Sequence, residues 1–133
     1  MQPPLPSKVH PMANILVIDD ESEVRYAIRA VLEDQGHAVD EADTGTAGLA
    51  AIEERAFDLV ICDIIMPDKE GIETIVEIKQ RLPQQKIVAI SGGGRIKKED
   101  YLAVAAAVGA TYTVSKPFDA ETLTDMVNAI LRN

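Results

Sequence analysis

The sequence predicts an α/β protein built on a doubly wound parallel sheet of five strands, with five helices. Five short apolar runs alternate with longer segments of helical period, and most runs are apolar throughout, as in strands that are covered on both faces. The connections are short, which favours right-handed crossovers between parallel strands. The runs lie at residues 15–18, 37–39, 59–62, 87–90 and 111–114, and the second is the weakest.

The helical segments carry their own start and stop signals. The helix expected at 24–32 ends near Gly36, where a left-handed cap is expected. The helix expected at 72–82 stops at Pro83, and the one expected at 101–108 ends before Gly109. The last begins after Asp119, a residue type that caps helices, and a weaker helix is expected from about 46 to 54. The apolar stripes of the four stronger helices comprise Val24, Ala27, Ile28, Val31 and Leu32; Ile72, Ile75, Val76 and Leu82; Tyr101, Leu102, Ala105 and Val108; and Leu123, Met126, Val127, Ile130 and Leu131.

Composition excludes several classes of protein. The 133 residues suit one domain, and their formal net charge of −9 with only five aromatic residues disfavours nucleic-acid binding. No apolar stretch is long enough for a membrane span, no secretion signal is present, and Cys62 has no partner for an internal disulfide. We therefore expect a cytoplasmic protein. Four of the seven prolines lie within residues 1–11, which should form an extended tail before a domain at 12–133.

Chemically reactive side chains follow four of the predicted strands. Asp19 and Asp20 follow the first, Asp63 the third, Ser91 and a run of glycines beginning at Gly92 the fourth, and Lys116-Pro117 the fifth. The carboxyl ends of parallel strands meet at one edge of the sheet, where ligands of such folds bind. Three carboxylates, one hydroxyl and one ammonium group should therefore share one crevice.

Each of these residues also has a purely structural interpretation. Asp20 could cap the first helix, with Glu23 completing a capping box, and Asp63 could open a turn. The glycines could form a loop without a ligand, and Lys116 could be solvated. Their joint placement at strand ends favours a functional site.

The chemistry of this set is coherent. Clustered carboxylates persist only if a cation offsets their repulsion, and oxygen ligands in a small site favour Mg²⁺. An aspartate can act as a nucleophile and form an aspartyl phosphate. Phosphoryl transfer then needs positioning and charge stabilisation, which Lys116, Ser91 and a metal could supply.

With these residues in place, the chain resembles the receiver domain of two-component response regulators, from about residue 13 to 132. The resemblance implies a flavodoxin-like sheet with strand order 2-1-3-4-5. It implies that Asp63 accepts a phosphoryl group from a sensor histidine kinase or a histidine phosphotransfer protein. The motifs that carry it are Asp19-Asp20, Asp63-Ile64-Ile65-Met66-Pro67 followed by Gly71, Ser91, and Lys116-Pro117-Phe118.

The resemblance also assigns the supporting residues. Asp20, Asp63 and the backbone carbonyl of Ile65 would ligate Mg²⁺, with Asp19 helping through water. Ser91 and Lys116 would contact the phosphoryl group. The bond between Lys116 and Pro117 is expected to be cis, a form that X-Pro bonds tolerate.

The signal would leave through the face made by the fourth helix, fifth strand and fifth helix, toward an unidentified downstream protein. This face includes Arg95, Tyr101 and Thr113, and it departs from the family because Thr113 stands where relatives carry an aromatic switch residue. Tyr112, one position earlier, should point to the opposite sheet face, and we expect it to pack.

The residues two positions after Asp63 and two positions after Ser91 are not of a type that would promote hydrolysis of an aspartyl phosphate. Ile65 and Gly93 have no side chain able to orient an attacking water, so we expect slow self-dephosphorylation and no enzymatic turnover. Three alternatives remain: a phosphatase with an aspartyl nucleophile, for which Ile65 is the wrong residue; a flavin carrier, whose phosphate Asp19 and Asp20 would repel; and a receiver-like domain that only binds a partner. No output domain follows Asn133, so a single-domain regulator is expected if the chain is complete.

Overall fold

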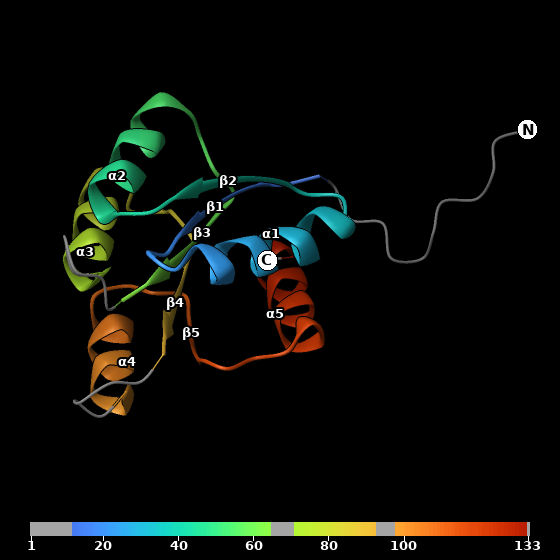
Figure 1. Cartoon of the computed structure of the whole chain (residues 1–133). Coiled ribbons are helices and arrows are strands. Elements are labelled where there is room, and N and C mark those ends of the chain that lie inside the picture. Colours follow the sequence, from blue (N-terminus) through green and yellow to red (C-terminus); the bar gives the residue numbers. More distant parts are fainter. Residues whose placement is uncertain (1–11, 65–70, 93–97, 133) are drawn as a thin grey trace, which may run out of the picture.

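The computed structural model of the chain describes residues 12–64, 71–92 and 98–132. It contains one parallel sheet with strand order β2-β1-β3-β4-β5, which confirms the predicted fold (Figure 1). The strands are β1 (Asn14–Ile18), β2 (Ala38–Ala42), β3 (Leu59–Asp63), β4 (Ile87–Ser91) and β5 (Tyr112–Ser115). The helices are α1 (Ser22–Asp34), α2 (Gly45–Glu54), α3 (Gly71–Arg81), α4 (Lys98–Ala107) and α5 (Ala120–Arg132).

Two helical layers cover the sheet. Helices α1 and α5 lie on one face, and α2, α3 and α4 lie on the other (Figure 1). Alternate residues of β1 enter opposite cores: Ile15 and Val17 pack under α1 and α5, whereas Leu16 and Ile18 pack under the other three helices. Burial on both faces explains why the central strands are apolar throughout.

The predicted helix signals hold with three exceptions. Gly36 and Gly109 have positive φ angles, and Asp119 accepts a hydrogen bond from the backbone of Thr122 at 2.7 Å. Leu82, however, lies beyond the end of α3 and is exposed, and Ala27 of α1 is exposed too. Asp20 does not cap α1, because the N-cap residue is Glu21 and its side chain makes no capping bond.

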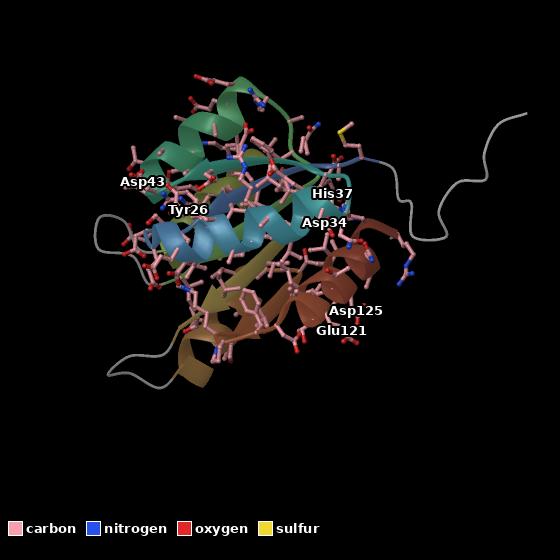
Figure 2. All side chains as sticks on the ribbon, turned by 45° about the vertical axis from the view of Figure 1, so that its right-hand side comes forward. Tyr26, Asp34, His37, Asp43, Glu121 and Asp125 are labelled. Carbon is pink, nitrogen blue, oxygen red and sulfur yellow. The ribbon has the colours of Figure 1, made fainter. Side chains whose placement is uncertain are left out.

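The acidic surplus lies largely on the outer surface. Asp34, Asp43, Glu121 and Asp125 are exposed at the ends or outer faces of α1, α2 and α5 (Figure 2). No helix in the part of the chain that the structure describes is long and apolar enough to cross a membrane. The predicted tail, residues 1–11, lies outside the described residues.

Candidate functional site

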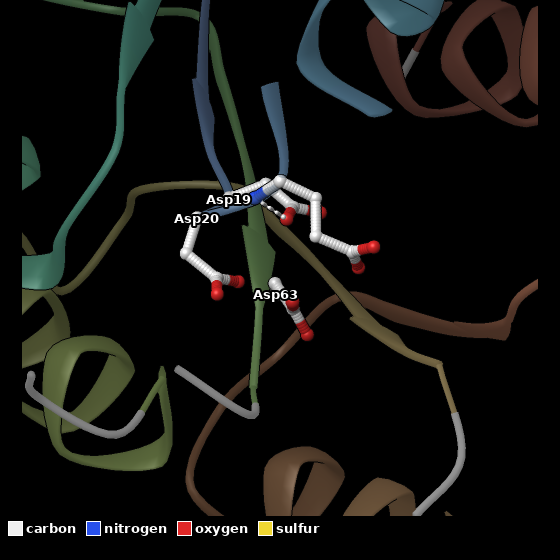
Figure 3. A group of neighbouring side chains, drawn as sticks. Asp19, Asp20 and Asp63 are labelled. Atoms are coloured by element: carbon white, nitrogen blue, oxygen red, sulfur yellow. Dashed lines mark hydrogen bonds between the residues drawn. The ribbon is translucent and has the colours of Figure 1, made fainter. Parts of the chain in front are cut away.

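Four carboxylates gather at the carboxyl edge of the sheet. Asp19, Asp20 and Glu21 follow β1 and Asp63 ends β3, and one ligand oxygen from each lies within 4.8 Å of the others (Figure 3). Asp19 and Asp63 are buried, whereas Asp20 and Glu21 are exposed. The three predicted aspartates are thus brought together. Glu21 was not predicted as a member, although an acidic residue directly after the aspartate pair was the available signal.

Lys116 supplies the cation of this crevice. Its Nζ lies 3.0 Å from Asp19 Oδ2, 3.0 Å from Glu21 Oε1 and 3.4 Å from Asp63 Oδ2. Burial lowers the pKa of Lys116, but the contact with Asp19, the charge of Asp63 and the hydrogen bond to Glu21 outweigh burial and raise that pKa above its ordinary value. The alternative of a solvated lysine is therefore wrong.

Ser91 presents a hydroxyl beside the same strands. It is the last residue of β4 and fully buried, and its carbonyl accepts a hydrogen bond from the Lys116 backbone at 2.8 Å. Among the residues described, its Oγ has no hydrogen-bond partner. A buried hydroxyl gains from a hydrogen-bond partner, so the Ser91 Oγ is a candidate contact for a ligand at this edge of the sheet.

The loops after β4 and β5 meet at Lys116. A Cβ added to Gly92 would lie 3.1 Å from Lys116 Cδ, so glycine leaves room for the lysine stem. The peptide bond between Lys116 and Pro117 is cis, as predicted. These loops therefore fit around the lysine side chain.

The backbone of the acidic turn is held from several sides. Arg25 Nη1 donates to the carbonyl of Asp19 at 2.7 Å, and its Nε donates to Glu41 of β2 at 2.9 Å. The Asp19 backbone N–H donates to the Ala42 carbonyl at 3.1 Å. Arg25 and Glu41 could not be recognised from the sequence. Arg25 lies in the first turn of α1 and contacts Glu41 on β2, and no local sequence pattern shows which helix residue will face which strand residue.

Gly71 supports Asp63 in a similar way. It is the first residue of α3, and a Cβ at this position would overlap the carbonyl oxygen of Asp63 and the Cα of Ile64. Its N–H donates to the Ile64 carbonyl at 3.2 Å. The helix therefore packs directly on the backbone that carries Asp63.

Some of the predicted residues fall outside the described part of the chain. These are Ile65, expected as a metal ligand, and Arg95, expected on the output face, whereas Tyr101 of that face lies on α4. On β5, Thr113 is exposed and pairs with Ala89, while Tyr112 pairs with Val88. Tyr112, which we expected to pack, is 40% exposed on the edge strand β5, so its packing is only partial.

The crevice has a donor set that fits a divalent metal. Four carboxylates and one ammonium group carry a summed charge of −4 + 1 = −3 when all are ionised. Hard carboxylate oxygens are the ligands of Mg²⁺ and Ca²⁺, and such a cation would offset the mutual repulsion. This acidic pocket can therefore bind a metal ion.

Comparison with known proteins agrees with this geometry. The family model of the response regulator receiver domain matches residues 15–128. The chain belongs to this family. Receiver domains are the phosphoacceptor modules of two-component signalling, and the described helices and strands fit that fold along nearly their whole length.

Individual relatives place this receiver domain among both single-domain and larger proteins. It is 31% identical over 117 residues to the chemotaxis protein CheY of Halobacterium salinarum, covering 88% of this chain and 95% of that protein. It is 33% identical to the photosynthetic apparatus regulatory protein RegA of Rhodobacter capsulatus over 119 residues, which cover 89% of this chain but only 61% of RegA. The crystal structure of the NtrX receiver domain from Brucella abortus matches with a TM-score of 0.84 and 34% identity, covering 90% of this chain and 98% of that one.

Proposed function

We propose that Asp63 is the phosphoacceptor and that its phosphoryl group comes from a phosphohistidine of a sensor histidine kinase or a histidine phosphotransfer protein. A carboxylate oxygen of Asp63 attacks phosphorus, a P–O bond forms, and the P–N bond breaks with its electron pair returning to the imidazole. The observation that carries the proposal is the position of Asp63: a buried carboxylate at the end of a central strand, 3.4 Å from Lys116 Nζ and grouped with three other carboxylates.

Lys116 and Ser91 are suited to receive the phosphoryl oxygens. The ammonium group of Lys116 carries fixed positive charge, since its pKa is raised, and it already lies against Asp63. The Ser91 hydroxyl is a buried donor whose oxygen has no partner in the described part of the molecule. Both groups would stabilise charge on the transferring phosphoryl group by preorganised contacts, which is the main source of catalysis in this reaction class.

Asp19, Asp20 and Asp63 would hold Mg²⁺, together with the carbonyl of Ile65, a residue outside the described part of the chain. When bound, this ion would neutralise charge on the carboxylates and on the phosphoryl oxygens. Asp19 is buried and turned toward Lys116, so it is better suited to a contact through water, whereas Asp20 is exposed. The carboxylate Asp63 would thus serve as both ligand and nucleophile.

Phosphorylation would then shift the domain between two surface arrangements. A phosphoryl group adds charge and strong acceptors at the sheet edge, which favours the arrangement that offers it Lys116 and Ser91. We propose that α4, β5 and α5 form the output face, read by a downstream protein rather than by nucleic acid. Because Thr113 is not aromatic, this output would use the backbone and α4 rather than an aromatic switch. Ile65 and Gly93 would leave the phosphorylated state long-lived.

Intact mass spectrometry after incubation with Mg²⁺ and acetyl phosphate tests the proposal. We expect one added phosphoryl group on the wild-type chain, none with Asp63→Asn and none with a chelator present. Asp125→Asn is the matched control, because it makes the same change at an exposed position on α5, away from the crevice (Figure 2). An adduct that persists in Asp63→Asn would overturn the assignment, as would a wild-type chain that acetyl phosphate and a panel of histidine kinases all fail to modify.

A further inference from the structure

Glu21 is an acidic residue of the crevice to which the proposed function gives no role. It occupies the N-cap position of α1, but its side chain does not bond to the helix. Its Oε1 instead accepts a hydrogen bond from Lys116 Nζ at 3.0 Å, across 95 residues of sequence. The Glu21 side chain therefore contacts Lys116 and not the helix end.

The backbone of Glu21 fixes where this carboxylate lies. Its N–H donates to Asp19 Oδ1 at 2.9 Å, and its carbonyl accepts from the N–H groups of Val24 and Arg25, each at 3.1 Å. Because both sides of the residue are held, the side chain starts from a defined point beside Lys116. The contact is therefore built into the turn between β1 and α1.

Three carboxylates compete for Lys116 in this arrangement. An ammonium group has three N–H donors, and three carboxylates, from Asp19, Glu21 and Asp63, lie within 3.4 Å of Nζ. Asp63, the proposed acceptor, is the most distant of the three. A phosphoryl oxygen that approaches Lys116 therefore competes with carboxylates that already lie against its ammonium group.

Glu21 is the carboxylate that is easiest to release. The Asp19 side chain is fully buried and that of Asp63 nearly so, whereas the Glu21 side chain is 60% exposed. Water can solvate Glu21 as soon as it leaves Lys116, while a released Asp19 would remain buried without its cation. The cost of freeing the lysine is therefore lowest on the Glu21 side.

We propose that Glu21 is a positioning residue that acts as a latch: it competes with an incoming phosphoryl group for Lys116 in the unphosphorylated chain and releases the lysine when that group arrives. The proposal rests on the proposed function, in which Asp63 is the acceptor and Lys116 contacts the phosphoryl group. It adds a residue that sets how readily that lysine becomes available.

Two substitutions separate the contact from its charge. Glu21→Gln removes the charge, and Glu21→Asp keeps the charge but shortens the side chain by one methylene, so that it no longer reaches Lys116. Both should raise the initial rate of phosphorylation by acetyl phosphate at saturating Mg²⁺ about two- to fivefold, the range expected for the loss of one exposed ion pair. Glu23→Gln is the control, because Glu23 is an exposed acid of the same helix turn and not one of the three ion-pair partners of Lys116 in the described structure.

The measurements are intact mass against time, Mg²⁺ affinity by calorimetry, and the thermal midpoint of each variant. An unchanged rate in Glu21→Gln would overturn the latch, and so would a wild-type rate in Glu21→Asp, which would assign the effect to charge alone. A lowered rate with weakened Mg²⁺ binding would make Glu21 a metal ligand instead. A merely structural role would lower the thermal midpoint without raising the rate. Absence of any adduct on the wild-type chain would count against the proposed function itself, separately from the latch.

Discussion

Gly71 should be the least replaceable glycine of the described structure. A Cβ at this position would overlap backbone atoms of Asp63 and Ile64, which cannot turn aside as a side chain can. Overpacking of this kind costs about 3 kcal/mol at the upper end of its usual range. Gly71 is the first residue of α3, where alanine has at most part of the advantage of about 1 kcal/mol that it has in a helix interior, so Gly71→Ala should lose at least about 2 kcal/mol of unfolding free energy. For a domain of this size that corresponds to a fall in the thermal midpoint of roughly 6–10 °C.

Gly48→Ala is the matched comparison. Gly48 is also a buried helical glycine, but an added Cβ there would meet only the side chain of Ile18, chiefly its terminal Cδ1, which can shift more easily than backbone atoms can. Thermal unfolding followed by circular dichroism should therefore give Gly71→Ala a thermal midpoint well below that of Gly48→Ala. Phosphorylation by acetyl phosphate should also slow in Gly71→Ala, because the displaced backbone carries Asp63. Equal thermal midpoints in the two variants would refute the reasoning.

The remaining predictions concern acid stability, the loop beside Lys116 and the buried thiol. Burial alone would raise the pKa of Glu41, but hydrogen bonds from Arg29 and Arg25 lower this pKa below its ordinary value. Ionised Glu41 therefore stabilises the fold at neutral pH, and this stabilisation is lost as the pH falls through the lowered pKa. Urea unfolding should show that the free energy of unfolding falls less between pH 7 and pH 3 for Glu41→Gln than for the wild type, and equal falls would contradict this. Gly92→Ala should keep its thermal midpoint but phosphorylate several-fold more slowly, because the new methyl group crowds Lys116; a wild-type rate in the mass assay would argue against it. Burial raises the pKa of the Cys62 thiol, so iodoacetamide should modify the chain only after unfolding, and rapid native labelling would disprove this.

The central part of the fold could be predicted because its strands obey a local rule. Strands β1, β3 and β4 are buried on both faces and are therefore apolar at every position or nearly so. The edge strand β2 does not follow this rule: its pairing with β1 continues to Ala42, although Asp40 and Glu41 end the apolar run at Val39. Glu41 is tolerated there because α1 supplies its arginine partners, a compensation that comes from tertiary packing and leaves no trace in the local pattern.

The candidate site divides along a similar line. Asp19, Asp63, Ser91 and Lys116 could be predicted because they act through their own side chains and stand at the ends of strands. Arg25 could not, and Gly71 entered only as part of the family motif without a role, because each acts on a neighbour's backbone. Arg25 donates to the carbonyl of Asp19, and Gly71 lets α3 approach the carbonyl of Asp63. Such contacts depend on distances between segments, which the spacing of residues in the sequence does not contain.

The charge of the crevice sets the order in which its ligands can bind. With four carboxylates against Lys116, the site carries a summed charge of −3, and Lys116 is already engaged by three of them. An incoming phosphoryl donor is itself an anion and would be repelled by this field. On the proposed function, we therefore expect neutralisation of the carboxylates to precede phosphoryl transfer, and release of Lys116 by Glu21 to accompany it. This order explains why a chelator should abolish phosphorylation completely, whereas loss of the Glu21 contact should only change its rate.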